Sequence, residues 1–118
     1  MPTRPFTFMN NKTCFKISKG YVFITLDDVN LIVSDDSDAF IYIDKTKLTV
    51  HSSLKELERK LPSEKFVRCH RSCMVNIDKV FQYKRTKTGS ILLLENGMEA
   101  PISRRNKNEI LKRLGIEG

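Results

Sequence analysis

Short runs of strand-forming residues recur along the chain, and turn formers interrupt each run after a few residues. In the first half the runs cover residues 14–18, 21–26, 29–34, 40–43 and 47–50. They are separated by Lys19-Gly20, Asp27-Asp28, Asp35-Asp36-Ser37-Asp38 and Asp44-Lys45. β-Branched and aromatic runs bounded by Gly and Asp clusters are typical of antiparallel strands joined by tight turns. The pattern therefore predicts a mainly β fold.

The second half continues in the same way, with runs at residues 66–68, 74–76, 80–83, 91–95 and 99–102. Asn96-Gly97 lies between the last two runs, and Asn-Gly between two strands is a strong hairpin signal. With 118 residues the chain is long enough to bury a core of its own, so we expect a single domain over residues 1–118. Residues 1–11 precede the first run and are expected to form a flexible or extended N-terminal arm.

Only two segments carry helix signals. Ser53 and Glu56 have the Ser-x-x-Glu spacing of a capping box, and Pro62 ends the helix that follows. Leu54, Leu57 and Leu61 fall on one face of that helix and would pack on the sheet. Ser103 can cap a last helix whose buried stripe is Ile110, Leu111 and Leu114, with Gly115 as its stop. We therefore expect two short helices, at about residues 53–61 and 104–114.

The positive charge is concentrated in the second half of the chain. Residues 1–58 hold 7 Lys/Arg against 8 Asp/Glu, a net charge of −1, whereas residues 59–113 hold 14 against 5, a net charge of +9. Clustered positive charge is typical of a nucleic-acid-binding face, because phosphate neutralisation and counterion release provide most of the affinity. The alternative interpretation is a basic protein with well-solvated lysines.

Cys69-His70 and Cys73 suggest a metal site or a thiol nucleophile, but buried structural cysteines are the favoured interpretation. The odd number of cysteines favours free thiols in a reducing cytoplasm. If residues 69–73 formed an extended strand, Cys69 and Cys73 would share one face and His70 would point to the other, while the remaining candidate ligands, Cys14 and His51, are distant. No phosphate loop, HExxH or GxSxG is present. We expect no enzyme activity, cofactor, metal or membrane span, the run Tyr21–Leu26 being too short for a bilayer.

Two arginine-rich segments adjoin apolar runs. Phe66-Val-Arg-Cys-His-Arg-Ser72 leads into the apolar residues 74–75, and Pro101-Ile-Ser-Arg-Arg-Asn-Lys107 leads into the last helix. The rigid guanidinium fork of arginine matches both phosphate oxygens and the O6/N7 edge of guanine. We therefore interpret Arg71 and Arg105 as binding residues, and Lys112 and Arg113 as the solvated end of a helix.

Taken in order, these motifs closely resemble the LytTR family of bacterial DNA-binding domains. The motifs are the leucine helix from Ser53, the Phe-x-Arg-x-His-Arg-Ser segment, Val75-Asn76, the Asn-Gly hairpin and Ile-Ser-Arg-Arg at residues 102–105. The resemblance covers roughly residues 12–114. It implies an elongated stack of small antiparallel sheets. It also implies a bacterial transcription regulator that binds duplex DNA sequence-specifically, as a response-regulator output domain with loops in the major groove.

The resemblance also implies the contact residues. Base contacts would come from Ser37, Arg71 and Arg105. Backbone or supporting contacts would come from His70, Ser72, Arg68, Ser103, Arg104 and Lys107. The aspartates around Ser37 would repel phosphate, so that loop either contacts DNA weakly, accepts a hydrogen bond from cytosine, or faces a protein partner. Family members commonly act with a sensor or receiver partner, and pairs of copies bind direct repeats.

Two other interpretations of the basic half remain open. A small β domain that binds single-stranded nucleic acid needs exposed aromatics as stacking platforms, whereas Phe66, Phe81 and Tyr83 mostly follow the core alternation here. A basic protein-interaction module would instead meet an acidic protein partner. Binding to single versus double strands distinguishes the first interpretation, and a DNA sequence preference distinguishes the second.

Overall fold

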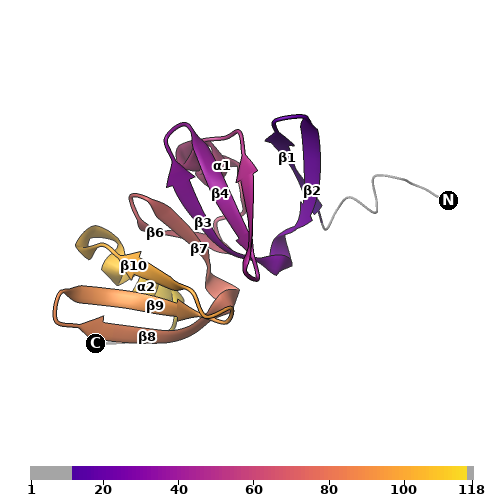
Figure 1. Ribbon diagram of the computed structural model, residues 1–118. Helices are drawn as coiled ribbons and strands as arrows, with labels where there is room; N and C mark the ends of the chain where they lie inside the picture. The colour runs from indigo at the N-terminus through magenta and orange to yellow at the C-terminus, as the bar shows by residue number, and fades with distance from the viewer. Residues whose placement is uncertain (1–11, 117–118) are drawn as a thin grey trace.

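The computed structural model describes residues 12–116, which fold into three antiparallel sheets arranged along an elongated molecule of 53 × 32 × 24 Å (Figure 1). The predicted N-terminal arm lies outside the described residues. All the predicted strands are confirmed: β1 (Lys12–Ile17), β2 (Gly20–Thr25), β3 (Val29–Asp35), β4 (Asp38–Ile43), β5 (Thr46–Val50), β6 (Phe66–His70), β7 (Cys73–Asn76), β8 (Val80–Thr86), β9 (Gly89–Leu94) and β10 (Glu99–Ile102).

The central sheet has five strands in the order β5-β4-β3-β7-β6. The hairpin β1–β2 forms a separate sheet beside it, joined by a hydrogen bond from the N–H of His51 to the carbonyl of Lys16 (2.8 Å). The third sheet has the order β10-β9-β8 and carries the predicted Asn-Gly turn between β9 and β10. In Figure 1 the three sheets follow one another across the molecule, which confirms the predicted stack of small antiparallel sheets.

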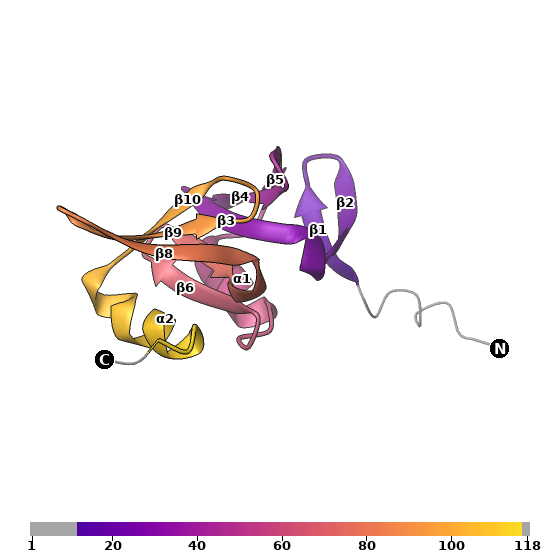
Figure 2. The same ribbon diagram turned by 90° about the horizontal axis from the view of Figure 1, so that it is seen from below.

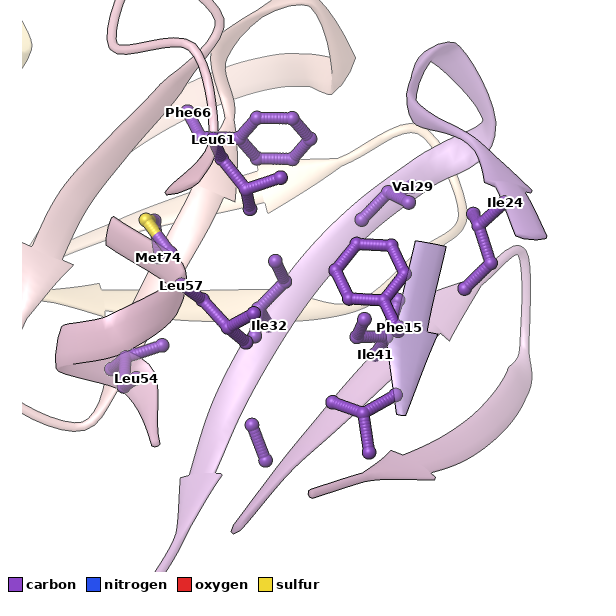
Figure 3. Close-up of a cluster of buried hydrophobic side chains, with 12 residues drawn as sticks. Phe15, Ile24, Val29, Ile32, Ile41, Leu54, Leu57, Leu61, Phe66 and Met74 are labelled. Atoms are coloured by element: carbon purple, nitrogen blue, oxygen red, sulfur yellow. The ribbon is translucent and has the colours of Figure 1, made fainter. Parts of the chain in front are cut away.

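The first hydrophobic core lies between helix α1 (Leu54–Lys60), the central sheet and the β1–β2 hairpin (Figure 3). Ser53 caps α1: its Oγ accepts from the N–H of Glu56, and the Glu56 carboxylate accepts from the N–H of Ser53. The latter bond lowers the pKa of Glu56. Leu54 and Leu57 are buried against the sheet, as their spacing predicts.

The second core lies between the β6–β7 hairpin, the three-stranded sheet and helix α2 (Lys107–Arg113). Ile110 is fully buried there, whereas Leu111 and Leu114, also predicted to be buried, are only half-buried. The predicted last helix is divided. Residues Arg104–Asn106 form a 3₁₀ turn before the seven-residue α2 begins. Figure 2 shows α2 beneath the sheet strands, with the 3₁₀ turn leading in from β10.

Two buried asparagines hold together segments that are distant in the sequence. Asn76 at the end of β7 donates to the carbonyl of Val29 (2.8 Å), and its Oδ1 accepts from the N–H of Asp78 (3.0 Å). Asn96 in the β9–β10 turn donates to the carbonyl of Asp44 in the β4–β5 turn. Asn76 therefore holds the end of β7 to the start of β3 within the central sheet, whereas Asn96 links the third sheet to the central one.

One sequence-based expectation about the aromatics is wrong. Phe66 is buried and Tyr83 is half-buried, but Phe81 is 71% exposed. The β8–β9 register shifts between Val80 and Gln82, and this irregularity places Phe81 outside the core alternation. Within the described residues, no helix is long and apolar enough to cross a membrane.

Candidate functional site

The His-Arg-Ser segment is the turn of a hairpin. Strand β6 ends at His70 and β7 begins at Cys73, so the chain reverses at Arg71 and Ser72. The extended strand considered for residues 69–73 is therefore wrong. The two cysteines still share a side, because the register shift between Arg68 and His70 brings Cys69 against Cys73 across the hairpin. Arg71 lies at the tip and is exposed.

Arg68 holds this turn from inside. Its Nε donates to the carbonyl oxygen of His70 (3.0 Å), and one terminal nitrogen donates to the carbonyl oxygen of Arg71 (2.8 Å). The other terminal nitrogen lies 2.5 Å from a carboxylate oxygen of Glu58 on helix α1. The guanidinium thus has two backbone partners in the turn and one ionic partner on the helix.

His70 and Ser72 hold each other at the base of the turn. The N–H of Ser72 donates to Nδ1 of His70 (3.2 Å), and the Ser72 hydroxyl lies 2.9 Å from the same nitrogen. Because a backbone N–H can only donate, Nδ1 is an acceptor and the hydrogen of the neutral ring lies on Nε2. Nε2 is therefore the ring nitrogen that can donate to a ligand.

Two backbone hydrogen bonds bring separate segments to this hairpin. The N–H of Ser34, near the end of β3, donates to the carbonyl of Ser72 (2.8 Å). The N–H of Ser103, after β10, donates to the carbonyl of Cys69 (2.8 Å). As a result the β3–β4 turn, the β6–β7 turn and the start of the last helix emerge on the same side of the molecule, at the left in Figure 1.

The second arginine-rich segment begins with a capped turn. Ser103 Oγ accepts from the N–H of Asn106 (3.3 Å) and from its side-chain amide (2.7 Å). This cap holds Arg104 and Arg105 in the 3₁₀ turn, and both are exposed. Lys107, the first residue of α2, is half-buried.

An open groove of about 450 Å³ joins the two arginine-rich segments. It is lined by Glu58, Arg68, His70, Arg71, Ser103, Arg105 and Asn106. Among residues 12–116, neither Arg71 nor Arg105 has a side-chain hydrogen-bond or ion-pair partner. The groove therefore presents two guanidinium groups whose donors are available to an anion or to a base edge.

Ser37 is not among the residues that line this groove. It is exposed in the two-residue turn between β3 and β4, next to Asp36, whose φ of 56° is left-handed. A carboxylate oxygen of Asp38 lies 3.2 Å from His51 Nδ1. Asp35 and Asp36 are exposed, and neither has an ion-pair partner among the described residues.

The cysteine pair lies beneath the turn. The sulfurs of Cys69 and Cys73 are 3.2 Å apart and both residues are buried. Hydrogen bonding to Cys73 and burial raise the pKa of Cys69, so its thiol is a poor nucleophile. Over residues 12–116 no group of three or more His, Cys, Asp and Glu side chains is arranged to hold a metal ion.

The sequence matches the family model of the LytTr DNA-binding domain over residues 19–115. The chain belongs to the LytTR family. The family resemblance carried by the leucine helix and the two arginine-rich segments is therefore confirmed.

A solved structure supports the assignment. The LytTr DNA-binding domain of a putative methyl-accepting/DNA response regulator from Bacillus cereus superimposes with a TM-score of 0.76 at 26% identity, covering 91% of this chain and 99% of that one. Similar proteins include the sensory transduction protein LytT of Bacillus anthracis, 26% identical over 90% of this chain and 44% of its own length. A response regulatory protein of Vibrio cholerae is 30% identical over 80% of this chain and 39% of its own length. This LytTR chain therefore spans about two fifths of such relatives.

One basic element of this LytTR domain was not singled out from the sequence. Lys84, Arg85 and Lys87 are exposed around the β8–β9 hairpin tip, which lies on the same side as the arginine turns in Figure 1. The signal was present as a cluster of cations beside Gly89, but strand pairing was needed to place it at a tip.

Proposed function

We propose that this LytTR domain binds duplex DNA sequence-specifically and reads bases in the major groove with Arg71, Arg105 and Ser37. Arg71 and Arg105 would each recognise guanine through the bidentate contact that a guanidinium makes with O6 and N7. Ser37 would contact a base from the β3–β4 turn. These residues act from turns, so readout needs no recognition helix.

The observation that carries this proposal is that two supported turns each present an arginine whose side chain has no partner among residues 12–116. The Arg71 turn is held by Arg68 and by the Ser34–Ser72 bond, while the Arg105 turn is capped by Ser103. Because the supports use backbone groups, the arginine forks stay available for a ligand. A polar group held by its surroundings loses less entropy on binding, which favours specific recognition.

Phosphate contacts and supporting contacts would surround the base readers. His70 can donate from Nε2, and Arg104 is exposed beside Arg105. The remaining members of this set are Ser72, Ser103, Lys107 and Arg68, to which the β8–β9 tip adds Lys84, Arg85 and Lys87. We assign Arg104 and the residues of the β8–β9 tip mainly to register and affinity, because phosphates carry no direct sequence information, whereas Arg68 supports the Arg71 turn.

The helices are poorly suited to reading a groove themselves. Helix α1 is buried through Leu54 and Leu57, and the seven-residue α2 is buried through Ile110. A hairpin is narrow enough to enter the major groove, which admits a two-stranded ribbon as well as a helix. At 53 Å the molecule is longer than one turn of B-DNA, about 34 Å, so different tips can face successive grooves.

The relatives suggest the wider role. They are called sensory transduction and response regulatory proteins, and each is more than twice the length matched here. We infer that the domain is the output module of a bacterial transcription regulator, controlled by a sensor or receiver partner and acting in the cytoplasm. We further propose that two copies bind direct repeats as a pair.

The first test is selection of preferred duplexes from a random library at physiological salt. It should be run with the wild type, with Arg71→Ala, with Arg105→Ala and with Lys45→Ala as the control. Lys45 is exposed in the β4–β5 turn, at the opposite end of β4 from Ser37. We expect a reproducible motif with the wild type and the control, and loss of one base preference with each arginine variant.

The outcomes separate the candidate functions. Retained binding without any enriched motif would overturn sequence-specific readout and leave a polyanion-binding or protein-binding surface. Exposed aromatics give some support to single-strand binding, since Tyr21, Phe23 and Phe81 are 50–71% exposed. None of them lines the arginine groove. Preference for a single strand, abolished by Phe81→Ala, would favour that alternative.

A further inference from the structure

We propose that Glu58 and Arg68 are a positioning pair that sets the direction of Arg71 and thereby the base preference of the domain. This inference rests on the proposed base-reading role of Arg71. It assigns to Glu58 a part in recognition, and it assigns Arg68 to the support of a base reader and not to a phosphate.

The first argument is how the Arg68 guanidinium is used. Three of its nitrogens have partners, namely Glu58 Oε1 at 2.5 Å, the His70 carbonyl at 3.0 Å and the Arg71 carbonyl at 2.8 Å. Its side chain is only 25% exposed. A phosphate would have to compete with these bonds, so the Arg68 guanidinium acts within the protein and is not available for a phosphate.

The second argument concerns which atoms Arg68 holds. The carbonyl of His70 belongs to the peptide plane before the Arg71 Cα, and the carbonyl of Arg71 belongs to the plane after it. Because peptide planes are rigid, fixing both carbonyls fixes the backbone on each side of that Cα. The direction in which the Arg71 side chain leaves the turn follows from this. A single guanidinium therefore determines where the exposed arginine points.

The third argument is electrostatic. Glu58 brings a carboxylate to the groove that is proposed to face DNA, where negative charge repels phosphate. Its side chain is 46% exposed, and a partly exposed ion pair contributes little to stability. The Glu58 carboxylate thus weakens non-specific DNA binding, and its ion pair with Arg68 adds little to the stability of the fold. Anchoring Arg68 to helix α1 accounts for a carboxylate at this position.

The test uses the full chain and two duplexes of about 30 base pairs, one with the motif selected by the wild type and one with a shuffled sequence. The key variant is Arg68→Lys, which keeps the charge but lacks the planar fork. We expect it to lose about tenfold or more on the motif duplex, with shuffled-duplex affinity and salt dependence unchanged. Arg59→Lys, exposed on α1, is the control.

Glu58→Gln gives an opposite pattern on the two duplexes. We expect weaker binding to the motif, because Arg68 loses its anchor, and equal or tighter binding to the shuffled duplex, because a negative charge is gone. Glu64→Gln, exposed in the α1–β6 connection, controls for the change of charge. Combining Arg68→Lys with Arg71→Ala should add nothing to the loss on the motif duplex, since Arg68 acts through Arg71.

Several results would overturn the proposal. Equal losses on both duplexes for Arg68→Lys would show a phosphate contact, and wild-type binding would show no role. The wild type and Arg68→Lys could prefer the same motif while Arg71→Ala loses it. In that case the base-reading role of Arg71 stands and only the positioning role of Arg68 fails. If the wild type selects no motif, the proposed function fails, and the backbone effect is then decided without DNA. ¹⁵N relaxation should show lower order parameters at Arg71 and Ser72 in Arg68→Lys, and unchanged values would refute the clamp.

Discussion

The backbone N–H of Ser103 donates to the carbonyl oxygen of Cys69 at 2.8 Å, which joins the start of the last helix to the hairpin that carries Arg71. The two residues are far apart in the sequence, and their segments belong to different sheets. Because both groups are part of the backbone, the link does not depend on a side chain. The segments that carry the two proposed base readers, Arg71 and Arg105, are therefore joined directly by their backbones.

Replacing Ser103 by Ala tests the cap that prepares the Arg105 turn. The variant removes the acceptor for the N–H and the side-chain amide of Asn106 but keeps the backbone bond to Cys69. Loss of such a cap costs about 1 kcal/mol, which urea unfolding followed by circular dichroism can measure. We expect weaker binding to a preferred duplex as well. Ser63→Ala, at an exposed position, should change neither quantity. Unchanged stability would mean that the cap is dispensable.

Local sequence signals predicted the elements of this fold well. The Ser53–Glu56 capping box and the Asn96-Gly97 turn depend on neighbouring residues, so a short window contains all the information they need. The same holds for the alternation of the strands. The two segments with arginines were identified because their charge lies within a few residues of apolar runs.

What the sequence could not show depends on contacts between distant residues. The two arginine-rich segments line one groove because the N–H of Ser103 donates to the carbonyl of Cys69, and no local sequence pattern predicts that bond. The predicted runs at residues 66–68 and 74–76 left residues 69–73 between two strands, but a turn centred on Arg71 was not predicted, because these residues include no Gly, Pro or Asn. Glu58 gave no signal either, since on a helix surface a glutamate is ordinary.

Asn76→Ala tests whether the buried amide stabilises the junction between the end of β7 and the start of β3. The change leaves the Val29 carbonyl without its 2.8 Å donor and the N–H of Asp78 without its acceptor. Unpaired buried polar groups cost about 1–3 kcal/mol each, so we expect roughly 2–6 kcal/mol of lost stability in urea unfolding. Asn108→Ala on the exposed side of α2 should stay within about 0.5 kcal/mol. A similarly small change for Asn76→Ala would contradict the assignment.

The acidic β3–β4 turn can be tested by comparing one of its aspartates with a matched aspartate in the β4–β5 turn. Asp36 and Asp44 both have left-handed φ values, 56° and 55°, and flank opposite ends of β4. Asn tolerates that conformation, so each Asp→Asn change removes one charge with little strain. Asp36→Asn should raise affinity for a random duplex about two- to threefold at low salt, and less at high salt, whereas Asp44→Asn should not. Equal effects of the two changes would place the acidic turn away from DNA.

Lys65 gives a prediction about pH. Its ammonium lies 2.6 Å from Asp27 and 3.0 Å from Asp78, which joins the 3₁₀ turn before β3 (Leu26–Asp28) to the 3₁₀ turn after β7 (Ile77–Lys79). The bond to Asp27, followed by that to Asp78, raises the pKa of Lys65 above 10.5, and the same contact with Lys65 lowers the pKa of Asp27 below 3.8. The two shifts define the pH range in which this contact stabilises the fold.

The stability that Asp27 contributes is complete above its ordinary pKa of 3.8 and is lost as the pH falls through the lower folded value. The contribution of Lys65 is complete below 10.5 and is lost as the pH rises through its higher folded value. The difference in unfolding free energy between wild type and Lys65→Met should therefore be largest at neutral pH and shrink at both extremes. Lys55→Met, exposed on α1, is the control for replacing a lysine by methionine. A constant difference for Lys65→Met would mean that the lysine acts only through its packed methylene chain.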